Sequence, residues 1–375
     1  MSAIGQPFRL GYRPALDGLR AVAVVAVMLH HSGLLPGGWL GVDVFFTLSG
    51  FLITTLLLEE YDRAGTVSFR HFYLRRARRL IPALLTMIAV WGTAALVWCP
   101  PEQFRLRLLF LALVLFYVGN LGIIAGLGVH QFGHTWSLAI EEQFYLFWPP
   151  ALLLLLQRVR NRVAVLSIVA IGAVASAAWR GLLVREHTHV VRVFVGLDTH
   201  ADSILIGCAL AMLLAWRNPL RRWLDGSWGR WMAAAAGLAL CGLFAAARFP
   251  EHFFQFASTL TAVVAALLIA ALLTHRGAVA KLLETRPLVG LGRISYGLYL
   301  WHFPVFFALG VVFGPPGLNP ASIALAWIAT FAASAVSFKL VEQPILRRGR
   351  TAGPDRDTRM ATPIPQIPAR AARSI

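Results

Sequence analysis

Apolar runs of about 18 to 25 residues recur along almost the whole chain, and each is long enough to cross a bilayer core of roughly 30 Å as a helix. Short polar or basic segments separate them. A helix is expected in each run because lipid offers the backbone no hydrogen-bond partners of its own. The runs lie at 18–35, 41–58, 81–98, 107–125, 139–156, 163–183, 194–216, 231–247, 256–274, 288–312 and 320–341. This pattern predicts an all-α integral membrane protein.

Basic residues gather in five segments between the runs, which is typical of loops on the cytoplasmic side of a membrane. These segments are 69–79, 157–162, 216–223, 275–281 and the tail that begins at 347. With a cytoplasmic N-terminus, all five face the cytoplasm only if 81–156 crosses the membrane twice. One of its three runs then does not cross, and we expect 107–125, which Asn120 and Gly122 interrupt. The prediction is a bundle of about ten transmembrane helices with one extra re-entrant segment and both termini cytoplasmic.

Composition supports this assignment to the cell membrane. The 375 residues are 58% hydrophobic and 14% charged, with a mean hydropathy of +0.68. A soluble protein has about 25% charged residues. The net charge of +17 could indicate a nucleic-acid partner, but the arginines lie in short segments between apolar runs, so we expect none. We expect a membrane domain over 1–346, followed by a disordered, basic, Pro-rich cytoplasmic tail over 347–375.

Two ionisable residues flank the apolar stretch of the first run, DGLRAVAVVAVMLHH. Arg20 and His31 are eleven positions apart, so on a helix they share one face and lie roughly 16 Å apart. Asp17 can contact Arg20 on that face. Ionisable groups inside a membrane are costly unless paired or hydrated, so they usually line a cavity. The alternative is that Arg20 extends to the interface and His31 only packs between helices.

Two later motifs combine charge with an adjoining apolar run. FYLRRARRLIPAL contains Arg75, Arg76 and Arg79, which either mark the cytoplasmic side or bind phosphate groups. HTWSLAIEEQFYLFWPP places Glu141 and Glu142 at the start of a helix, where carboxylates also suit the helix dipole. Both a structural and a functional reading stay open for each motif.

Three further polar positions are candidates for the lining of a cavity. Asp43 opens the second run and could instead cap its helix. Asp202 follows Asp198 and His200, but these positions do not share a helix face, so we expect no metal site. His302 lies beside Trp301 in an aromatic run, where packing is the common role.

Seven motifs, taken in order, resemble the acyltransferase-3 family of membrane O-acyltransferases. They are the Arg20–His31 pair, GVDVFFTLSGFLIT, FYLRRARRLIPAL, HTWSLAIEEQFYLFWP, the T-x-A-D piece around Asp202, ISYGLYLWHFP and FKLVEQPILR. The resemblance covers residues 12–347 and implies a ten-helix bundle that moves an acyl group, often acetyl, from cytoplasmic acyl-CoA to a hydroxyl. The implied acceptors are glycans, lipids and secreted small molecules. One departure is His200, which stands where the family often has arginine.

Matched to the family position by position, the residues receive expected roles. Those expected in catalysis are His31, Arg20 and Glu142; those expected to bind acyl-CoA, most simply acetyl-CoA, are Arg75, Arg76 and Arg79; further cavity candidates are Asp17, Asp43, Asp202 and His302. His31 would take the proton of the acceptor hydroxyl as general base. The alternative function is a transporter or flippase of an anionic lipid or glycan, because buried charges could equally line a conduit.

Overall fold

The computed structural model describes residues 9–98, 101–127, 131–216, 227–248, 251–274, 277–312 and 319–351. These residues form helices and turns, with no β-strand among them, so the all-α prediction is confirmed over this part of the chain. In chain order the elements are α1 (Pro14–His31), η1 (Gly38–Leu40), α2 (Gly41–Ala64), α3 (Phe69–Trp98), α4 (Pro101–Leu115), α5 (Gly119–Ile124), η2 (Gly133–Thr135), α6 (Trp136–Arg158), α7 (Arg162–Arg185), α8 (Val190–Val195), α9 (Leu197–Trp216), α11 (Ser227–Ala246), α12 (Glu251–Thr274), α13 (Ala278–Leu283), α14 (Arg286–Arg293), α15 (Ser295–Ala308), α16 (Pro320–Ser337), η3 (Phe338–Glu342) and α17 (Gln343–Thr351).

Six helical segments among the described residues are long and apolar enough to cross a membrane. They are Gly38–Ala64, Arg162–Arg185, Val190–Trp216, Trp228–Ala246, Phe256–Thr274 and Pro320–Arg347. Helices α1, α3 and α6 have a comparable length but carry the ionisable residues of the sequence motifs. The expected total of about ten crossings stays a prediction.

The run 107–125 is not one helix. It divides into α4 and α5, and Tyr117 between them has a left-handed backbone with φ of 54°. The fifteen residues of α4 extend over about 22 Å, which is less than the roughly 30 Å of a bilayer core. Neither piece alone is long enough to cross, and the assignment of this segment as the non-crossing one stays a prediction.

Several basic segments expected to be loops are helical. Residues 69–79 form the first turns of α3, and Pro82 lies inside the same helix. Arginine, leucine and alanine favour helices, so the basic segment continues the apolar one without a break. Residues 347–351 belong to α17 and 278–281 to α13, whereas 217–223 and 352–375 lie outside the described residues.

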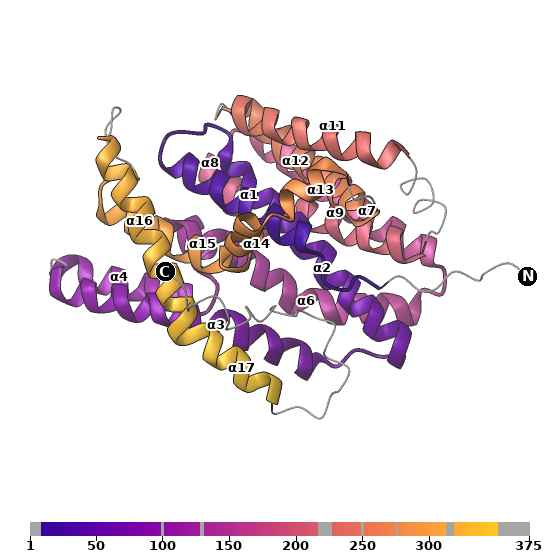
Figure 1. Ribbon diagram of the computed structural model, residues 1–375, viewed down its shortest axis with the longest axis horizontal. Coiled ribbons are helices and arrows are strands. Elements are labelled where there is room, and N and C mark those ends of the chain that lie inside the picture. Colours follow the sequence, from indigo (N-terminus) through magenta and orange to yellow (C-terminus); the bar gives the residue numbers. More distant parts are fainter. Residues whose placement is uncertain are drawn as a thin grey trace, which may run out of the picture.

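Helix α1 runs through the middle of the bundle, where it contacts α2, α14 and α15 (Figure 1). Helices α2 and α9 pack at close range because each contributes a glycine. A Cβ atom on Gly50 would lie 2.0 Å from the Ile204 carbonyl oxygen, and one on Gly207 would lie 2.1 Å from that of Thr47. Glycine at these two positions lets the two helix backbones approach closely.

Candidate active site

Arg20 and His31 lie on one face of α1, as their spacing predicts. The Nε of Arg20 donates to the Ser295 hydroxyl at 3.2 Å, and Nδ1 of His31 lies 3.0 Å from Nε2 of His302. Ser295 and His302 are seven positions apart, so they too share a face, that of α15. Helices α1 and α15 therefore run side by side and in the same direction, with a polar contact near each end.

The expected contact between Asp17 and Arg20 is wrong. Asp17 instead accepts a hydrogen bond from the Tyr12 hydroxyl at 2.9 Å. Arg20 makes no ion pair within 4 Å with any residue in the described part of the chain. Its guanidinium is held by a neutral hydroxyl alone, so its charge is left for an anion.

Three histidines gather beside the C-terminal end of α1. His302 is fully buried, and its ring centroid lies 5.1 Å from that of His31 and 5.2 Å from that of His134. His134, on η2, is 3% exposed and stacks on Phe303. His134 lies in the same motif as Glu141 and Glu142, seven positions before Glu141. The structure places it with His302, because the chain turns through η2 before α6 begins.

Arg76 lies against carboxylates and does not present a free charge. Its guanidinium donates to Glu142 from Nε at 2.9 Å and from Nη2 at 2.7 Å, and Nη2 is 3.8 Å from Glu141. Its Cζ lies 3.2 Å from the centre of the Tyr145 ring. The charge of Arg76 is thus compensated by carboxylates, and its expected binding of phosphate stays a prediction. Arg76 holds Glu142, and this pair lies between α3 and α6, without contact to His31.

Glu141 has a set of contacts that sequence analysis missed. It accepts hydrogen bonds from the hydroxyl of Ser49 on α2 and from that of Tyr145 at 2.6 Å. The Glu-Glu pair thus divides: Glu142 turns to α3 and Glu141 to α2. The serine of TLSG carried no signal of this contact, because its partner lies 92 positions later.

The other two arginines of the α3 motif are exposed. Arg75 is 57% exposed in its side chain and lies 4.0 Å from Glu60. Arg79 lies within electrostatic range of Arg20 and Arg76, and it makes no ion pair within 4 Å in the described chain. The expected binding of acyl-CoA by the three motif arginines stays a prediction. Arg20 and Arg79 lie within electrostatic range of each other, and neither makes an ion pair within 4 Å in the described chain.

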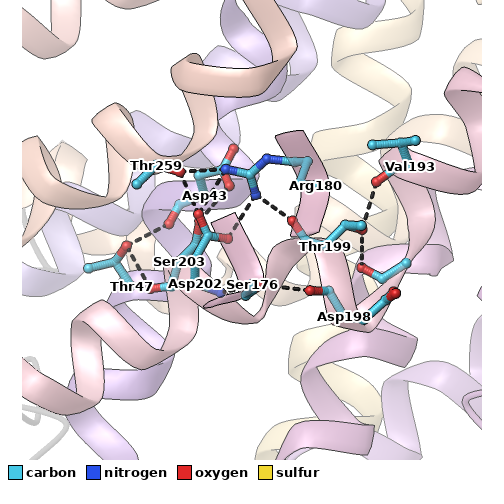
Figure 2. Close-up of polar contacts among 11 residues, drawn as sticks. Asp43, Thr47, Ser176, Arg180, Val193, Asp198, Thr199, Asp202, Ser203 and Thr259 are labelled. Atoms are coloured by element: carbon cyan, nitrogen blue, oxygen red, sulfur yellow. Dashed lines mark hydrogen bonds and ion pairs between the residues drawn. The ribbon is translucent and has the colours of Figure 1, made fainter. Parts of the chain in front are cut away.

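Asp202 belongs to a buried ion pair away from the α1–α15 face (Figure 2). Nη1 and Nη2 of Arg180 donate to its two carboxylate oxygens, each at 2.8 Å, and both side chains are 0% exposed. Thr259 also donates to Asp202, at 2.6 Å, and Arg180 donates to the Thr199 carbonyl. Arg180 carried no sequence signal beyond its place in an apolar run. This cluster joins α7, α9 and α12.

Asp43 lies in the same region of the bundle (Figure 2). It is 1% exposed and accepts a hydrogen bond from the Ser203 hydroxyl at 2.8 Å, so it makes no helix cap. Asp43 and Asp202 both bond to side chains of neighbouring helices, and their expected place in the lining of a cavity stays a prediction. Asp198 instead pairs with Arg192 near the surface, and no group of three or more His, Cys, Asp or Glu side chains in the described ranges is placed to hold a metal ion.

The helical bundle and its interior ionisable groups define the class: a membrane protein with a histidine-containing polar site. Nε2 of His31 has no hydrogen-bond partner among the described residues, and the side chain is half-buried. Such a nitrogen is free to exchange a proton with a bound molecule. The two free guanidinium groups lie toward the other end of the same helix face.

The chain belongs to the acyltransferase-domain family, which it matches over residues 13–341. This confirms the resemblance carried by the seven motifs. Its relatives include the peptidoglycan O-acetyltransferase OatA of Listeria monocytogenes, 35% identical over 356 residues, and the putative peptidoglycan O-acetyltransferase YrhL of Bacillus subtilis, 34% identical over 366 residues. The O-acetyltransferase OatA of Staphylococcus aureus is 33% identical over 356 residues.

These matches cover 90% of this chain but only 56%, 55% and 58% of the three relatives. The chain therefore spans about half the length of the curated relatives it matches. No solved structure gives a significant match to the chain.

Proposed function

We propose that this protein is a multi-pass membrane O-acyltransferase that moves an acyl group, most simply acetyl, from cytoplasmic acyl-CoA to a hydroxyl of a cell-envelope glycan. The observation that carries the proposal is the shared face of α1, on which Arg20 and His31 both turn to α15. Membership of the acyltransferase family supports acyl transfer, and the relatives that are named for peptidoglycan support a glycan acceptor.

In the proposed reaction, His31 is the general base. Its free Nε2 takes the proton of the acceptor hydroxyl as that oxygen attacks the thioester carbonyl carbon. The tetrahedral intermediate collapses, so the new C–O bond remains and the C–S bond breaks. The departing CoA thiolate takes the proton back from His31. Atoms and charge balance without a metal or a redox partner.

The donor is held at the other end of the same face. CoA carries several phosphate charges, and the proposed phosphate contacts are Arg20 and Arg79, which lie near each other and make no ion pair within the described chain. About three turns of α1 separate Arg20 from His31, which is roughly 16 Å. A donor with its charges and its thioester at opposite ends of a flexible arm fits this separation. Arg76 acts indirectly in this scheme, because it orients Glu142.

The test is His31→Ala in the detergent-purified full chain, with His30→Ala as the matched control. His30 is the next residue of the same helix, but its Nδ1 lies 3.3 Å from the Leu35 carbonyl oxygen, away from α15. We expect His31→Ala to lower the rate of acetyl transfer to a glycan acceptor by about 100- to 10,000-fold, the usual contribution of a positioned base. His30→Ala should stay close to the wild-type rate, and both variants should elute as folded protein. Equal losses in the two variants would remove the assignment.

The same assay separates the proposal from a transporter or flippase. An enzyme of this kind releases free CoA only when both acyl-CoA and an acceptor are present, and it leaves an acyl-sized mass increase on the acceptor. A protein that only moves an anionic lipid or glycan releases no CoA under these conditions. Acceptor-independent or absent CoA release from the wild type would contradict the proposed function.

A further inference from the structure

His302 is placed between His31 and a backbone carbonyl. Its Nδ1 lies 2.6 Å from the carbonyl oxygen of Tyr299, and its Nε2 lies 3.0 Å from Nδ1 of His31. Both contacts are of hydrogen-bond length. The ring is fully buried, and Phe306 meets its face edge-on with centroids 5.9 Å apart. The position of the His302 ring is therefore fixed on both sides.

The carbonyl oxygen determines where the protons lie. A carbonyl can only accept a hydrogen bond, so a neutral His302 must carry its proton on Nδ1 to satisfy Tyr299. Its Nε2 is then an acceptor. Because Nε2 faces Nδ1 of His31, that contact is a hydrogen bond only if His31 carries its own proton on Nδ1. With the protons in these positions, the free lone pair of the His31 ring is on Nε2.

His134 does not disturb this order. Its Nε2 lies 3.2 Å from the Leu300 carbonyl oxygen, so a neutral His134 donates there and keeps its proton away from His302. Its contact with His302 is between rings, at an interplanar angle of 76°. His302 thus has one donor contact and one acceptor contact, and neither competes with the other.

We propose that His302 is a positioning residue that holds His31 in the Nδ1–H tautomer, so that Nε2 of His31 is the nitrogen that receives the acceptor proton. This inference rests on the proposed function, in which His31 is the base. It assigns His302 a role through His31 and no contact with the substrate. The Tyr299 carbonyl orients His302, and His302 in turn orients His31. In principle this is comparable to the carboxylate that fixes the tautomer of a catalytic histidine.

Two substitutions distinguish orientation from packing. In His302→Gln, the amide oxygen can still accept from Nδ1–H of His31, whereas His302→Leu fills a similar volume and offers no acceptor. We expect His302→Leu to lower kcat by about 10- to 100-fold, as for other residues that orient a reacting group, with the KM for acetyl-CoA within about 2-fold of wild type. His302→Gln should retain most of kcat. If His302 only packs, we expect the opposite order of kcat, with His302→Leu more active than His302→Gln, because leucine replaces buried contacts better than a polar amide does.

The outcomes separate this inference from the proposed function. If the wild type fails to release acceptor-dependent CoA, or His31→Ala retains full activity, the proposed function itself is wrong. If those two results stand but His302→Leu is as active as His302→Gln, or its loss appears in KM and not in kcat, only the positioning role is overturned.

A measurement on the wild type covers the case in which a His302 variant does not fold. Nitrogen-15 NMR of the histidine-labelled protein reports which ring nitrogen carries the proton, and the His31 signals are identified by their absence in His31→Gln. At a pH where the ring is neutral, we expect a protonated Nδ1 and an unprotonated Nε2. His30, whose Nδ1 faces a carbonyl, gives a reference signal in the same spectrum. The reverse tautomer at His31 would overturn the inference.

Discussion

Removal of the Asp202 carboxylate tests how strongly an unpaired charge inside the bundle destabilises the protein. Asp202→Ala leaves the Arg180 guanidinium 0% exposed without its two carboxylate contacts, and Thr259 also loses its acceptor. Breaking a buried ion pair in this way costs about 3–5 kcal/mol, because the remaining charge stays buried without compensation. We therefore expect a large loss of stability from a residue outside the proposed active site.

The same helix supplies a matched control. Asp198 pairs with Arg192 through Oδ1 at 3.0 Å and Oδ2 at 2.7 Å, so its two-point geometry resembles that of the buried pair. Its side chain is 42% exposed and that of Arg192 is 31% exposed. Exposed ion pairs contribute about 0.2–1 kcal/mol. Asp198→Ala should thus be several times milder than Asp202→Ala, although both remove one aspartate from α9.

Thermal unfolding of the detergent-purified protein, followed by tryptophan fluorescence, measures the difference. Each kcal/mol lowers the midpoint by about 2–4 °C in domains of about 150–250 residues, so Asp202→Ala should fall by roughly 10 °C. The double variant Arg180→Met with Asp202→Leu should recover much of that loss, because it removes both charges together. Equal midpoints for the two single variants, or a double variant less stable than Asp202→Ala, would refute the reasoning.

Two further predictions use the close helix contact and the free arginines. Gly207→Ala should destabilise the protein by about 1–3 kcal/mol, because the added Cβ would lie 2.1 Å from the Thr47 carbonyl oxygen. The control Gly237→Ala adds a Cβ that meets nothing within 4 Å, so it should be neutral or slightly stabilising in the same thermal assay. Arg79→Ala should raise the KM for acetyl-CoA by about 10-fold, the equivalent of about 1.4 kcal/mol, whereas Arg78→Ala should leave that KM unchanged. If Arg79→Ala changed only the KM for the acceptor, the phosphate contact would be contradicted.

The shared face of α1 could be predicted because a helix period fixes it. Eleven positions make about three full turns, so Arg20 and His31 had to project together once the segment was helical. Local spacing therefore predicts which side chains of one helix act together.

Spacing does not predict which partner a side chain finds on another helix. Arg76 was expected to bind phosphate, but it pairs with Glu142, 66 positions away. Arg180 neutralises Asp202 across the α7–α9 contact, and nothing in either local sequence indicated it. A charge in an apolar run indicates that a partner is needed, and the identity of that partner depends on tertiary packing.

The degree of pairing separates two kinds of interior charge in this protein. Arg180 and Arg76 each have a two-point carboxylate contact, so their charges are compensated within the fold and they join helices. Arg20, which is half-buried, has one hydroxyl contact and no ion pair within the described chain. An uncompensated cation inside a membrane protein is costly unless water or an anion reaches it. The proposed donor, which has anionic groups at one end and a reactive centre at the other, would supply that anion to Arg20 and place the reactive centre near Nε2 of His31.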